Sequence, residues 1–323
     1  GFTMKKILLC ISLSVILVAL SACGGGTISY PTVDTPAELP WRATAKSAND
    51  EYTVYDVTKY YGGDLKKPLT TSDSLLSFHV SVAVNETSDL MCTLDTTLKM
   101  VYNDDELNGA NKGKTDVITS KAIFRADDLT AVYTQKTANL QTTPSLNYSF
   151  EADYAAGKAT MGEKEISIPT GTYYDNEYLY YYVRALKSLG ENMNETLHIV
   201  NWYESFLANE LKTYSLTTSS APNSVEMSDF IAGLYDGDNV SDGKIKCTVV
   251  QLNVAAKKSS GTGSPLTFAY AVGNASTQNN SLNIKSTFRK ALLRFETVEY
   301  FMNGNVKAAT EYTLKSISID EIA

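Results

Sequence analysis

Alternation of apolar and polar side chains recurs along most of the chain, and it constrains the fold more than any other feature of the sequence. In the stretch from residue 77 to residue 84, every second residue is apolar, namely Phe78, Val80, Val82 and Val84. A period of two places these side chains on one face of a β-strand. The chain also contains 21 tyrosines but only two tryptophans, and tyrosine suits the half-buried surface of a sheet. The sequence therefore predicts a mainly β protein.

The strand pattern continues over most of the chain after residue 48. We predict about 11 to 13 strands. The best segments are 51–61, 77–84, 90–102, 121–125, 129–136, 145–154, 158–161, 195–203, 211–217, 244–255, 266–272, 290–302 and 307–319, while 224–234 is ambiguous between strand and helix. Asn303 and Gly304 are the strongest hairpin signal, because both accept the positive φ of a type I′ turn. We expect residues 48–323 to form a single domain, a large antiparallel curved sheet or half-open β-barrel with one covering helix.

One segment has helical rather than strand periodicity. Thr172 and Asp175 have the spacing of a capping box. The apolar residues that follow at helical spacing are Leu179, Val183 and Leu186. We therefore predict a helix over residues 175–189, with its leucine side packed on a face of the sheet.

Tyrosines crowd this predicted helix. Tyr178, Tyr181 and Tyr182 form a stripe beside the leucine face, and we expect this stripe at the rim of the sheet. One interpretation is that the stripe completes the packing of the helix. The other is that the phenol rings line the entrance of a cavity, where they supply apolar area together with a hydrogen bond. On the second interpretation the candidate ligand-binding residues are Tyr178, Leu179, Tyr181 and Tyr182.

The start of the chain carries an export signal. Lys5 and Lys6 precede an apolar run over residues 7–20, which is short for a membrane span. The run ends in Leu20, Ser21, Ala22 and Cys23, which resemble the lipobox of bacterial lipoproteins. The resemblance implies that residues 4–22 are a signal peptide and that Cys23 becomes a lipid-modified N-terminus on the extracytoplasmic side of a bacterial membrane. The alternative is an ordinary secreted protein with a coincidental cysteine.

Composition limits the partners of the exported chain. Residues 23–47 are rich in Gly, Pro, Thr and Ala, and they predict a flexible tether. Loss of residues 1–22 removes Lys5 and Lys6, so the net charge changes from −8 to −10. An acidic surface argues against nucleic acid and against electrostatic docking on anionic lipid. Membrane attachment then depends on the acyl chains at Cys23.

Two cysteines remain for the domain after Cys10 leaves with the signal peptide and Cys23 is lipidated. Cys92 and Cys247 both lie in apolar, alternating segments. In an exported protein they could form a disulfide. They could equally be two buried thiols in strands, since cysteine behaves as a small hydrophobic residue.

The sequence offers little for catalysis. Its two histidines are His79 and His198, and it has no Gly-x-Ser-x-Gly, Walker A or His-Glu-x-x-His motif. Asp236 and Asp238 match the first two ligands of a calcium loop, but Val240 occupies the position of the third, so an Asx-rich turn is the better interpretation. We expect a non-enzymatic protein without a metal or cofactor.

Several short segments resemble a known family. They are the turn at residues 124–129, the strand pair at 148–158, the helix start at 174–179 and the stretch 184–186. Together they resemble the uncharacterised bacterial envelope proteins of domain-of-unknown-function family 3108. These are similar to lipoprotein carriers, which fold as a half-open antiparallel barrel with a helix that plugs its mouth. The resemblance covers residues 75–319 and implies no catalytic residues.

Two functions remain open. The leading hypothesis is a lipid-anchored, non-catalytic protein that binds an apolar or amphiphilic envelope component on the concave face of its sheet. The alternative is a surface interaction or adhesion module that works through exposed loops. A row of large apolar residues on an uncovered sheet face would favour the first hypothesis, and a filled interior would favour the second.

Overall fold

The computed structural model describes residues 28–38, 49–62, 67–190, 192–226, 244–254, 266–271, 290–300 and 306–321. Several predicted features lie outside these residues. They are the signal peptide, the lipidation site Cys23, residues 39–47 of the tether, residues 227–234 of the ambiguous segment, the Asx-rich turn at Asp236 and Asp238, and the hairpin turn at Asn303 and Gly304.

Fourteen antiparallel strands form one sheet within the described part of the chain. They are β1 (Asn49–Tyr61), β2 (Leu75–Val84), β3 (Leu90–Val101), β4 (Thr115–Arg125), β5 (Ala131–Leu140), β6 (Tyr148–Asp153), β7 (Lys158–Met161), β8 (Lys164–Ser167), β9 (Thr196–Val200), β10 (Thr213–Glu226), β11 (Lys244–Val254), β12 (Leu266–Ala271), β13 (Leu292–Tyr300) and β14 (Val306–Glu321). The mainly β prediction is confirmed, and the short β8 was not among the predicted strands.

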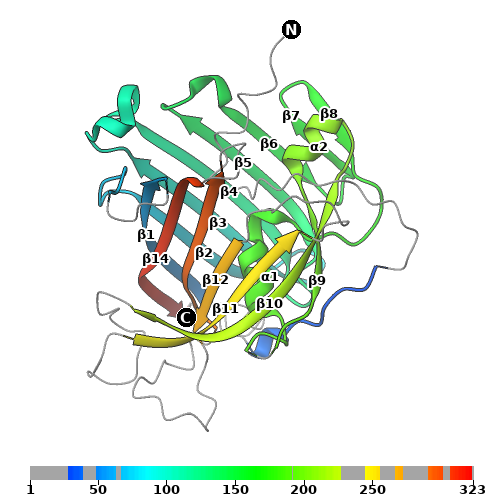
Figure 1. Ribbon diagram of the computed structural model, residues 1–323. Helices are drawn as coiled ribbons and strands as arrows, with labels where there is room; N and C mark the ends of the chain where they lie inside the picture. The colour runs from blue at the N-terminus through cyan, green and yellow to red at the C-terminus, as the bar shows by residue number, and fades with distance from the viewer. Residues whose placement is uncertain are drawn as a thin grey trace.

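The chain runs through the sheet as two meanders that meet at the first and last strands. The spatial order is β8-β7-β6-β5-β4-β3-β2-β1-β14-β13-β12-β11-β10-β9. β1 pairs with β14 over its whole length, for example Val57 with Tyr312. Figure 1 shows the two meanders as arms of one strongly curved sheet, with helix α1 between them. The edge strands β8 and β9 are not paired with each other, so the curved sheet remains half open.

Alternation along the strands explains which face is buried. On β2 the side chains of Leu76, Phe78, Val80 and Val82 are buried, whereas Val84 at the end of the strand is 47% exposed. Burial of one face of each strand gives a core in the concavity of the sheet.

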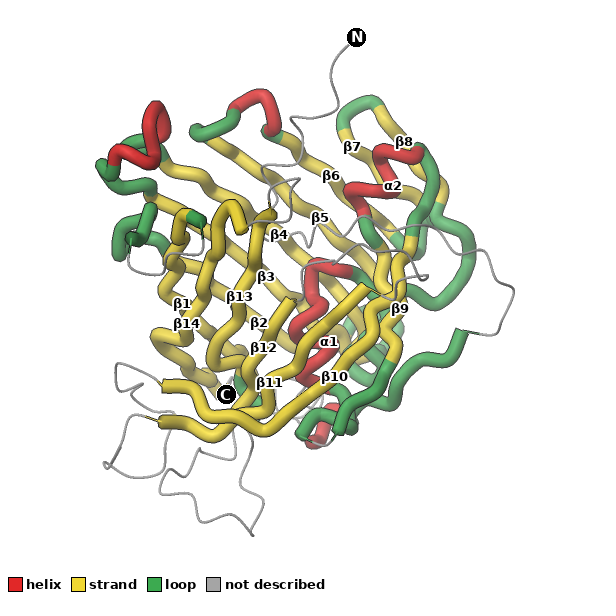
Figure 2. Tube along the Cα trace, viewed as in Figure 1, coloured by secondary structure: helices red, strands yellow, loops and turns green. Residues whose placement is uncertain are grey.

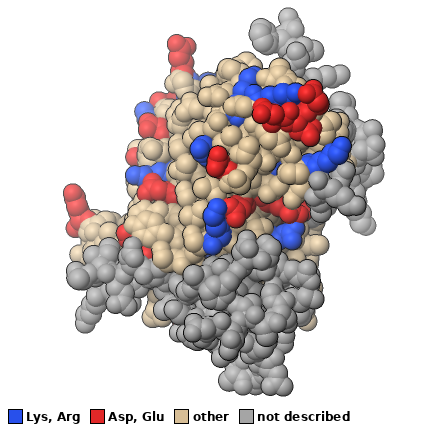
Figure 3. Space-filling model, turned by 90° about the vertical axis from the view of Figure 1, so that its left-hand side faces the viewer, with Lys and Arg blue, Asp and Glu red and all other residues tan. Residues whose placement is uncertain are grey.

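Figure 3 shows acidic and basic side chains next to one another on one side of the molecule, rather than a patch of a single sign.

Helix α1 (Leu179–Ala185) follows the 3-10 helix η6 (Asn176–Tyr178). The predicted helix over 175–189 is therefore too long. It ends at Ala185 because Leu186 adopts an extended conformation and forms a β-bridge with Val33 of the N-terminal segment. The Asp175 side chain caps the start, as it accepts a hydrogen bond from the backbone N–H of Glu177.

A second helix, α2 (Trp202–Ala208), begins where the sequence predicted the end of a strand. Asn201 caps it by accepting a hydrogen bond from the Glu204 N–H. Figure 2 shows α2 beside β7 and β8. Three further 3-10 helices are η2 (Pro36–Glu38), η4 (Glu106–Asn111) and η5 (Pro144–Leu146). No helix among the described residues is long and apolar enough to cross a bilayer.

Residues 28–38 fall within the predicted tether, yet they lie against the domain. The Asp34 N–H donates to the Ala185 carbonyl at 2.7 Å, and the Lys187 N–H donates to the Thr32 carbonyl at 3.0 Å. We call residues 28–38 the N-terminal segment. This part of the predicted tether is held in place by the end of α1.

The core consists of two clusters. The larger one fills the concavity between the arms and includes all the apolar residues of α1. The smaller one joins the far end of the first arm to α2 and includes Phe150, Ile166, Trp202 and Phe206. The Lys164 ammonium also donates to the Phe206 carbonyl at 3.1 Å. Helix α2 thus packs between the two unpaired edges of the sheet.

Candidate functional site

The predicted ligand-binding residues are Tyr178 at the end of η6 and Leu179, Tyr181 and Tyr182 on α1, and they lie in the interior and not at a rim. Tyr178 and Tyr182 are fully buried, and Leu179 and Tyr181 are almost fully buried. The Tyr178 ring stacks on Phe124 with its centroid 4.4 Å away, and its hydroxyl donates to the Leu129 carbonyl at 2.8 Å. The prediction of tyrosines at the rim is wrong, because α1 is enclosed by both arms of the sheet and has no solvent side.

The remaining rings of α1 are packed in the same way. Tyr182 stacks on Tyr174 at 4.3 Å with an interplanar angle of 3°. Tyr180 lies 4.3 Å from Phe78 of the first arm, and its carbonyl accepts a hydrogen bond from the Tyr270 hydroxyl of the second arm. Burial raises the pKa of Tyr174 to about 12, so its phenol stays protonated at physiological pH. These contacts leave α1 with a packing role that joins the arms.

A buried ion pair fixes α1 to the first strand of the sheet. The Arg184 guanidinium donates two hydrogen bonds to the Glu51 carboxylate, at 2.6 and 3.1 Å. Both side chains are buried, at 3% and 0% exposure. Burial alone would lower the pKa of Arg184, but the nearby Glu51 carboxylate raises it above its ordinary value, so the guanidinium stays protonated. A second buried pair joins Lys136 on β5 to Glu177 at 2.9 Å.

Asp175 connects the start of this helical region to both clusters of the core. Its carboxylate accepts hydrogen bonds from the Tyr154 hydroxyl at 2.6 Å and from the Trp202 indole N–H at 2.7 Å. Its backbone forms a parallel bridge with Val200 at the end of β9. Asp175 is fully buried, and these donors replace the water that its charge loses. The sequence predicted a capping box in which Asp175 follows Thr172, whereas in the structure Asp175 is itself the N-cap, and neither of these two partners was predicted.

The opposite end of the concave face has an opening. A cavity of about 150 Å³ lies where β1, β3 and β5 end and where β4 and β14 begin. We call it the mouth pocket. Its apolar lining includes the buried Leu69, Met100, Tyr102 and Leu140, and its lining also includes Tyr61 and Leu107, which are 44% and 48% exposed.

The mouth pocket and α1 are separated along the same strands. Arg184 meets β1 at Glu51, whereas the pocket is lined by Lys59 on that strand. Eight residues of strand span about 26 Å. Lys59 contacts Glu299 at 3.1 Å, and Lys307 contacts the same carboxylate at 3.5 Å. A charged group therefore borders an apolar pocket, which is an arrangement that suits an amphiphile.

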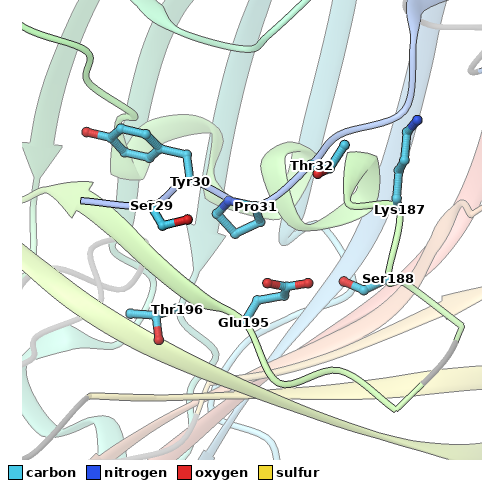
Figure 4. A pocket seen from close by; sticks show the side chains of 8 residues that line it. All are labelled: Ser29, Tyr30, Pro31, Thr32, Lys187, Ser188, Glu195 and Thr196. Carbon is cyan, nitrogen blue, oxygen red and sulfur yellow. The ribbon is translucent and has the colours of Figure 1, made fainter. Parts of the chain in front are cut away.

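A second hollow lies beside the N-terminal segment. It has a volume of about 660 Å³ and is lined by Ser29, Tyr30, Pro31, Thr32, Lys187, Ser188, Glu195 and Thr196. We call it the N-terminal cleft. Figure 4 shows the Glu195 carboxylate directed toward Pro31 and Ser188, with the Lys187 ammonium pointing away from it. The cleft is thus polar and carries both signs of charge.

The cysteines and histidines are dispersed. Cys92 on β3 and Cys247 on β11 are buried thiols, which agrees with the second interpretation, and burial raises the pKa of Cys247 to about 11. His79 contacts Asp50 at 3.1 Å, and His198 contacts the Ser215 hydroxyl at 3.0 Å. Burial lowers the pKa of His198. Within the described residues, no group of three or more His, Cys, Asp or Glu side chains could hold a metal ion.

Sequence reasoning did not select the residues of either hollow. Leu107 lies in the stretch 103–109, whose acidic and amide residues indicate a solvated loop, and a single leucine among them was the available signal. The sequence contained no signal for the N-terminal cleft, because its two walls are more than 150 residues apart in the chain.

The fold and these hollows define a half-open antiparallel β protein with a helix in its concavity. No protein-family model and no curated protein matches the chain. A solved structure described as a β-barrel-like protein of domain of unknown function 1849 from Brucella abortus is 8% identical, covers 84% of this chain and 98% of its own, and has a TM-score of 0.44. No family model supports the resemblance to family 3108, and what stands is the half-open antiparallel sheet that the structure shows.

Proposed function

We propose that this protein is exported, anchored to a bacterial membrane through a lipid on Cys23, and binds an apolar or amphiphilic envelope component without catalysis. The observation that carries this proposal is the mouth pocket. It lies on the concave face of the sheet and combines an apolar lining with the Lys59, Glu299 and Lys307 charges. The site is thus at the end of the concavity that α1 leaves free.

The size of the mouth pocket limits what enters it. Its volume of about 150 Å³ is below the roughly 300–1,000 Å³ of pockets that enclose a whole small molecule. Only a short apolar group fits inside. The rest of the ligand would extend over Tyr61 and Leu107, two of the few large apolar side chains that are exposed in the described part of the chain. An acyl or isoprenoid end with a polar head has this form.

The proposed anchor rests on the sequence around Cys23. Each methylene of an acyl chain contributes about 0.8 kcal/mol of membrane affinity, so two or more chains hold a protein durably. Replacing Cys23 with Ser removes the sulfur that would carry the diacylglyceryl group. The protein should then leave the detergent phase on phase separation, and unchanged partitioning would rule out the anchor.

The binding site is tested with two matched leucines. Leu107 lines the mouth pocket, and Leu207 on α2 lies away from it, with exposures of 48% and 51%. Because both are half exposed, either change to Ala should alter stability little. Leu107→Ala should weaken binding of a naphthalene sulfonate probe and of a medium-chain amphiphile, while Leu207→Ala should not. Equal binding by both variants would exclude the mouth pocket.

A surface interaction module is the second candidate. It is supported by α1, whose side chains are all buried and leave the middle of the concavity filled. Such a module would show no retained small ligand on native mass spectrometry of the full chain. It would also bind the probe equally before and after Leu107→Ala.

A further inference from the structure

The distance between the proposed lipid anchor and the N-terminal segment is short. Four residues separate Cys23 from Ile28, the first described residue. A chain from Cys23 to Ile28 spans at most about 17 Å even when it is fully extended. A lipidated Cys23 lies near the boundary of the hydrocarbon layer, and the headgroup layer adds roughly 5–8 Å on each side. Ile28 is therefore within roughly 10 Å of the headgroups.

The N-terminal segment is fastened to the domain, so it cannot readily detach and increase the distance between the lipid anchor and the domain. The Asp34 carboxylate accepts a hydrogen bond from the Lys290 ammonium at 2.6 Å, with both side chains less than 10% exposed. Lys290 also donates to the Leu186 carbonyl at 3.0 Å. Lifting the segment would leave a buried lysine without its carboxylate, which is strongly unfavourable. Nearer the anchor, the Tyr30 hydroxyl donates to the Thr172 carbonyl at 3.0 Å.

The face that is drawn to the bilayer contains the N-terminal cleft. Ser29, Tyr30 and Thr32 form one wall, and Glu195 and Thr196 at the start of β9 form the other. Ile28 is 50% exposed beside this wall. Figure 1 shows the N-terminal segment in blue, on the side of the domain away from the cyan turn that contains η4. The mouth pocket lies at η4, because Leu107 and Asn108 line it. Anchoring thus places the cleft toward the membrane and the mouth pocket away from it.

Three side chains of the cleft, those of Lys187, Ser188 and Glu195, have polar ends without a partner among the described residues. Among the described residues, neither Lys187 nor Glu195 forms an ion pair, and the Ser188 hydroxyl oxygen is buried without a hydrogen-bond partner. An unpaired buried hydroxyl costs about 1–3 kcal/mol and calls for a ligand or ordered water. A carboxylate and a hydroxyl inside the cleft, with an ammonium at its border, suit a ligand with a cationic and an anionic end.

We propose that the N-terminal cleft binds a zwitterionic aminophosphate headgroup of the membrane that carries the anchor. Glu195 and Ser188 receive the primary ammonium, and the exposed Lys187 side chain, whose ammonium points away from the cleft in Figure 4, turns toward the phosphate at the border of the cleft. The net charge of −10 on the exported chain disfavours a purely anionic surface, which leaves zwitterionic lipid as the natural partner. This inference rests on the lipid anchor of the proposed function, and it adds an orientation and a lipid class.

The orientation is tested with the full lipidated protein in vesicles of phosphatidylethanolamine and phosphatidylcholine that contain a headgroup-bound quencher. Asn194→Cys places a fluorophore beside the cleft, and Ala110→Cys in η4 places a control on the other side of the domain. Cys92 and Cys247 are buried, so the introduced thiol is the one that reacts. Quenching should be at least severalfold stronger at position 194 than at position 110.

Headgroup binding is separated from tethering by a longer linker. Inserting about ten Gly and Ser residues between Thr27 and Ile28 gives the domain freedom to leave the surface. Position 194 should remain quenched in vesicles with phosphatidylethanolamine but not with phosphatidylcholine alone, whose quaternary ammonium donates no hydrogen bond. Glu195→Gln should weaken this retention about tenfold, as expected for loss of a charge-assisted hydrogen bond, while the exposed control Glu163→Gln should not.

Each outcome decides one level of the proposal. If the unmodified protein does not float with vesicles, the anchor itself is wrong and this inference falls with it. If it floats but positions 194 and 110 are quenched equally, the anchor stands and the orientation is wrong. If quenching after linker insertion does not depend on phosphatidylethanolamine or on Glu195, the cleft is not a headgroup site.

Discussion

The two ends of the concave sheet differ in what fills them. At one end α1 occupies the concavity, its side chains are buried, and its charge is neutralised by Glu51. At the other end the strands enclose the mouth pocket, with exposed apolar side chains and ammonium groups around it. The same alternation of apolar residues produces both ends. The difference comes from the helix, which closes one of them.

This comparison separates stability from binding. Residues around α1 are held by contacts between the arms, so changes there should act on folding. Residues such as Tyr61 and Leu107 contribute little buried area, so changes there should act on ligands. Tyrosine content alone does not distinguish binding residues from residues that stabilise the fold, since the tyrosines of α1 lie at the end of the concavity that the helix fills.

The largest expected effect comes from breaking the buried ion pair of α1. Arg184→Met leaves the Glu51 carboxylate buried without its partner, and the free energy of unfolding should fall by about 3–5 kcal/mol. Urea denaturation measures this change. Lys158→Met is the control, because the Lys158–Glu165 pair has both side chains more than half exposed and should contribute only about 0–1 kcal/mol. If the two variants lost similar amounts of unfolding free energy, α1 would not close its end of the concavity.

Leu186→Ala sharpens the same contrast through packing. Leu186 is fully buried just after α1, and truncating it should cost about 2–5 kcal/mol. Leu107→Ala, at the mouth pocket, should cost about 0.5 kcal/mol or less because half of its surface is already in water. Thermal unfolding of both variants provides the comparison. If Leu107→Ala melts at a lower temperature than Leu186→Ala, the two ends do not differ in the way described.

Asp175→Asn tests the link between α1 and α2. The change weakens the hydrogen bonds from Tyr154 and Trp202, which are donated to a charged carboxylate, and should cost about 1.5–3 kcal/mol. Trp202 fluorescence should change with it, measured in a Trp41→Phe background so that a single tryptophan reports. An unchanged emission spectrum and midpoint would show that Asp175 is not the connection between the two clusters.

The smallest effect concerns His198, near the N-terminal cleft. Burial holds the pKa of His198 below its ordinary 6.5, so the unfolded chain binds a proton at higher pH than the folded chain does. Stability should therefore fall as the pH decreases through about 6.5 and should level off below the lowered pKa. Urea midpoints between about pH 7.5 and pH 5 measure this, with His198→Gln as the reference. If the urea midpoint of His198→Gln changed with pH as steeply as that of the wild type, His198 would not be the source of the pH dependence.

The strands could be predicted because a period of two is a local property. The pairing of β1 with β14 could not, since alternation defines a face but not a partner. In the hairpin of β13 and β14, the pair of Glu299 with Ala308 has the register that a two-residue turn at Asn303 and Gly304 requires. The register then shifts by one residue, so that Tyr300 pairs with Val306, and the turn itself lies outside the described residues.

The helices show where local patterns lose to tertiary contacts. Helical spacing continued to Leu189, but the bridge between Val33 and Leu186 ends α1 earlier. For α2 the opposite holds, because Asn201 and Glu204 have capping spacing that was available in the sequence. The apolar residues before Asn201 led to the prediction of a strand over residues 195–203 instead of a helix that begins after Asn201.

The stripe of tyrosines left packing and a rim open as alternatives, and the structure agrees with packing. Amphipathic rings suit a rim when their hydroxyls need water. Here the Tyr178 hydroxyl, just before α1, donates to the Leu129 carbonyl, and the Tyr181 hydroxyl on α1 donates to the Glu51 carboxylate. The hydroxyls of Tyr180 and Tyr182, in contrast, are buried without a hydrogen-bond partner among the described residues. Leu129 and Glu51 come from distant parts of the chain, so the sequence pattern contained no sign of these contacts.

Hydrogen exchange of the full chain, with and without a medium-chain amphiphile, tests the contrast between the two ends most directly. Amides of α1 should exchange only through global unfolding and should be unaffected by the amphiphile. Amides of residues 102–116 around the mouth pocket should exchange faster in the free protein and should gain protection when the amphiphile binds. If α1 instead exchanges faster than the mouth pocket and is the region that gains protection, then the helix is the entrance and the mouth pocket is not the binding end of the sheet.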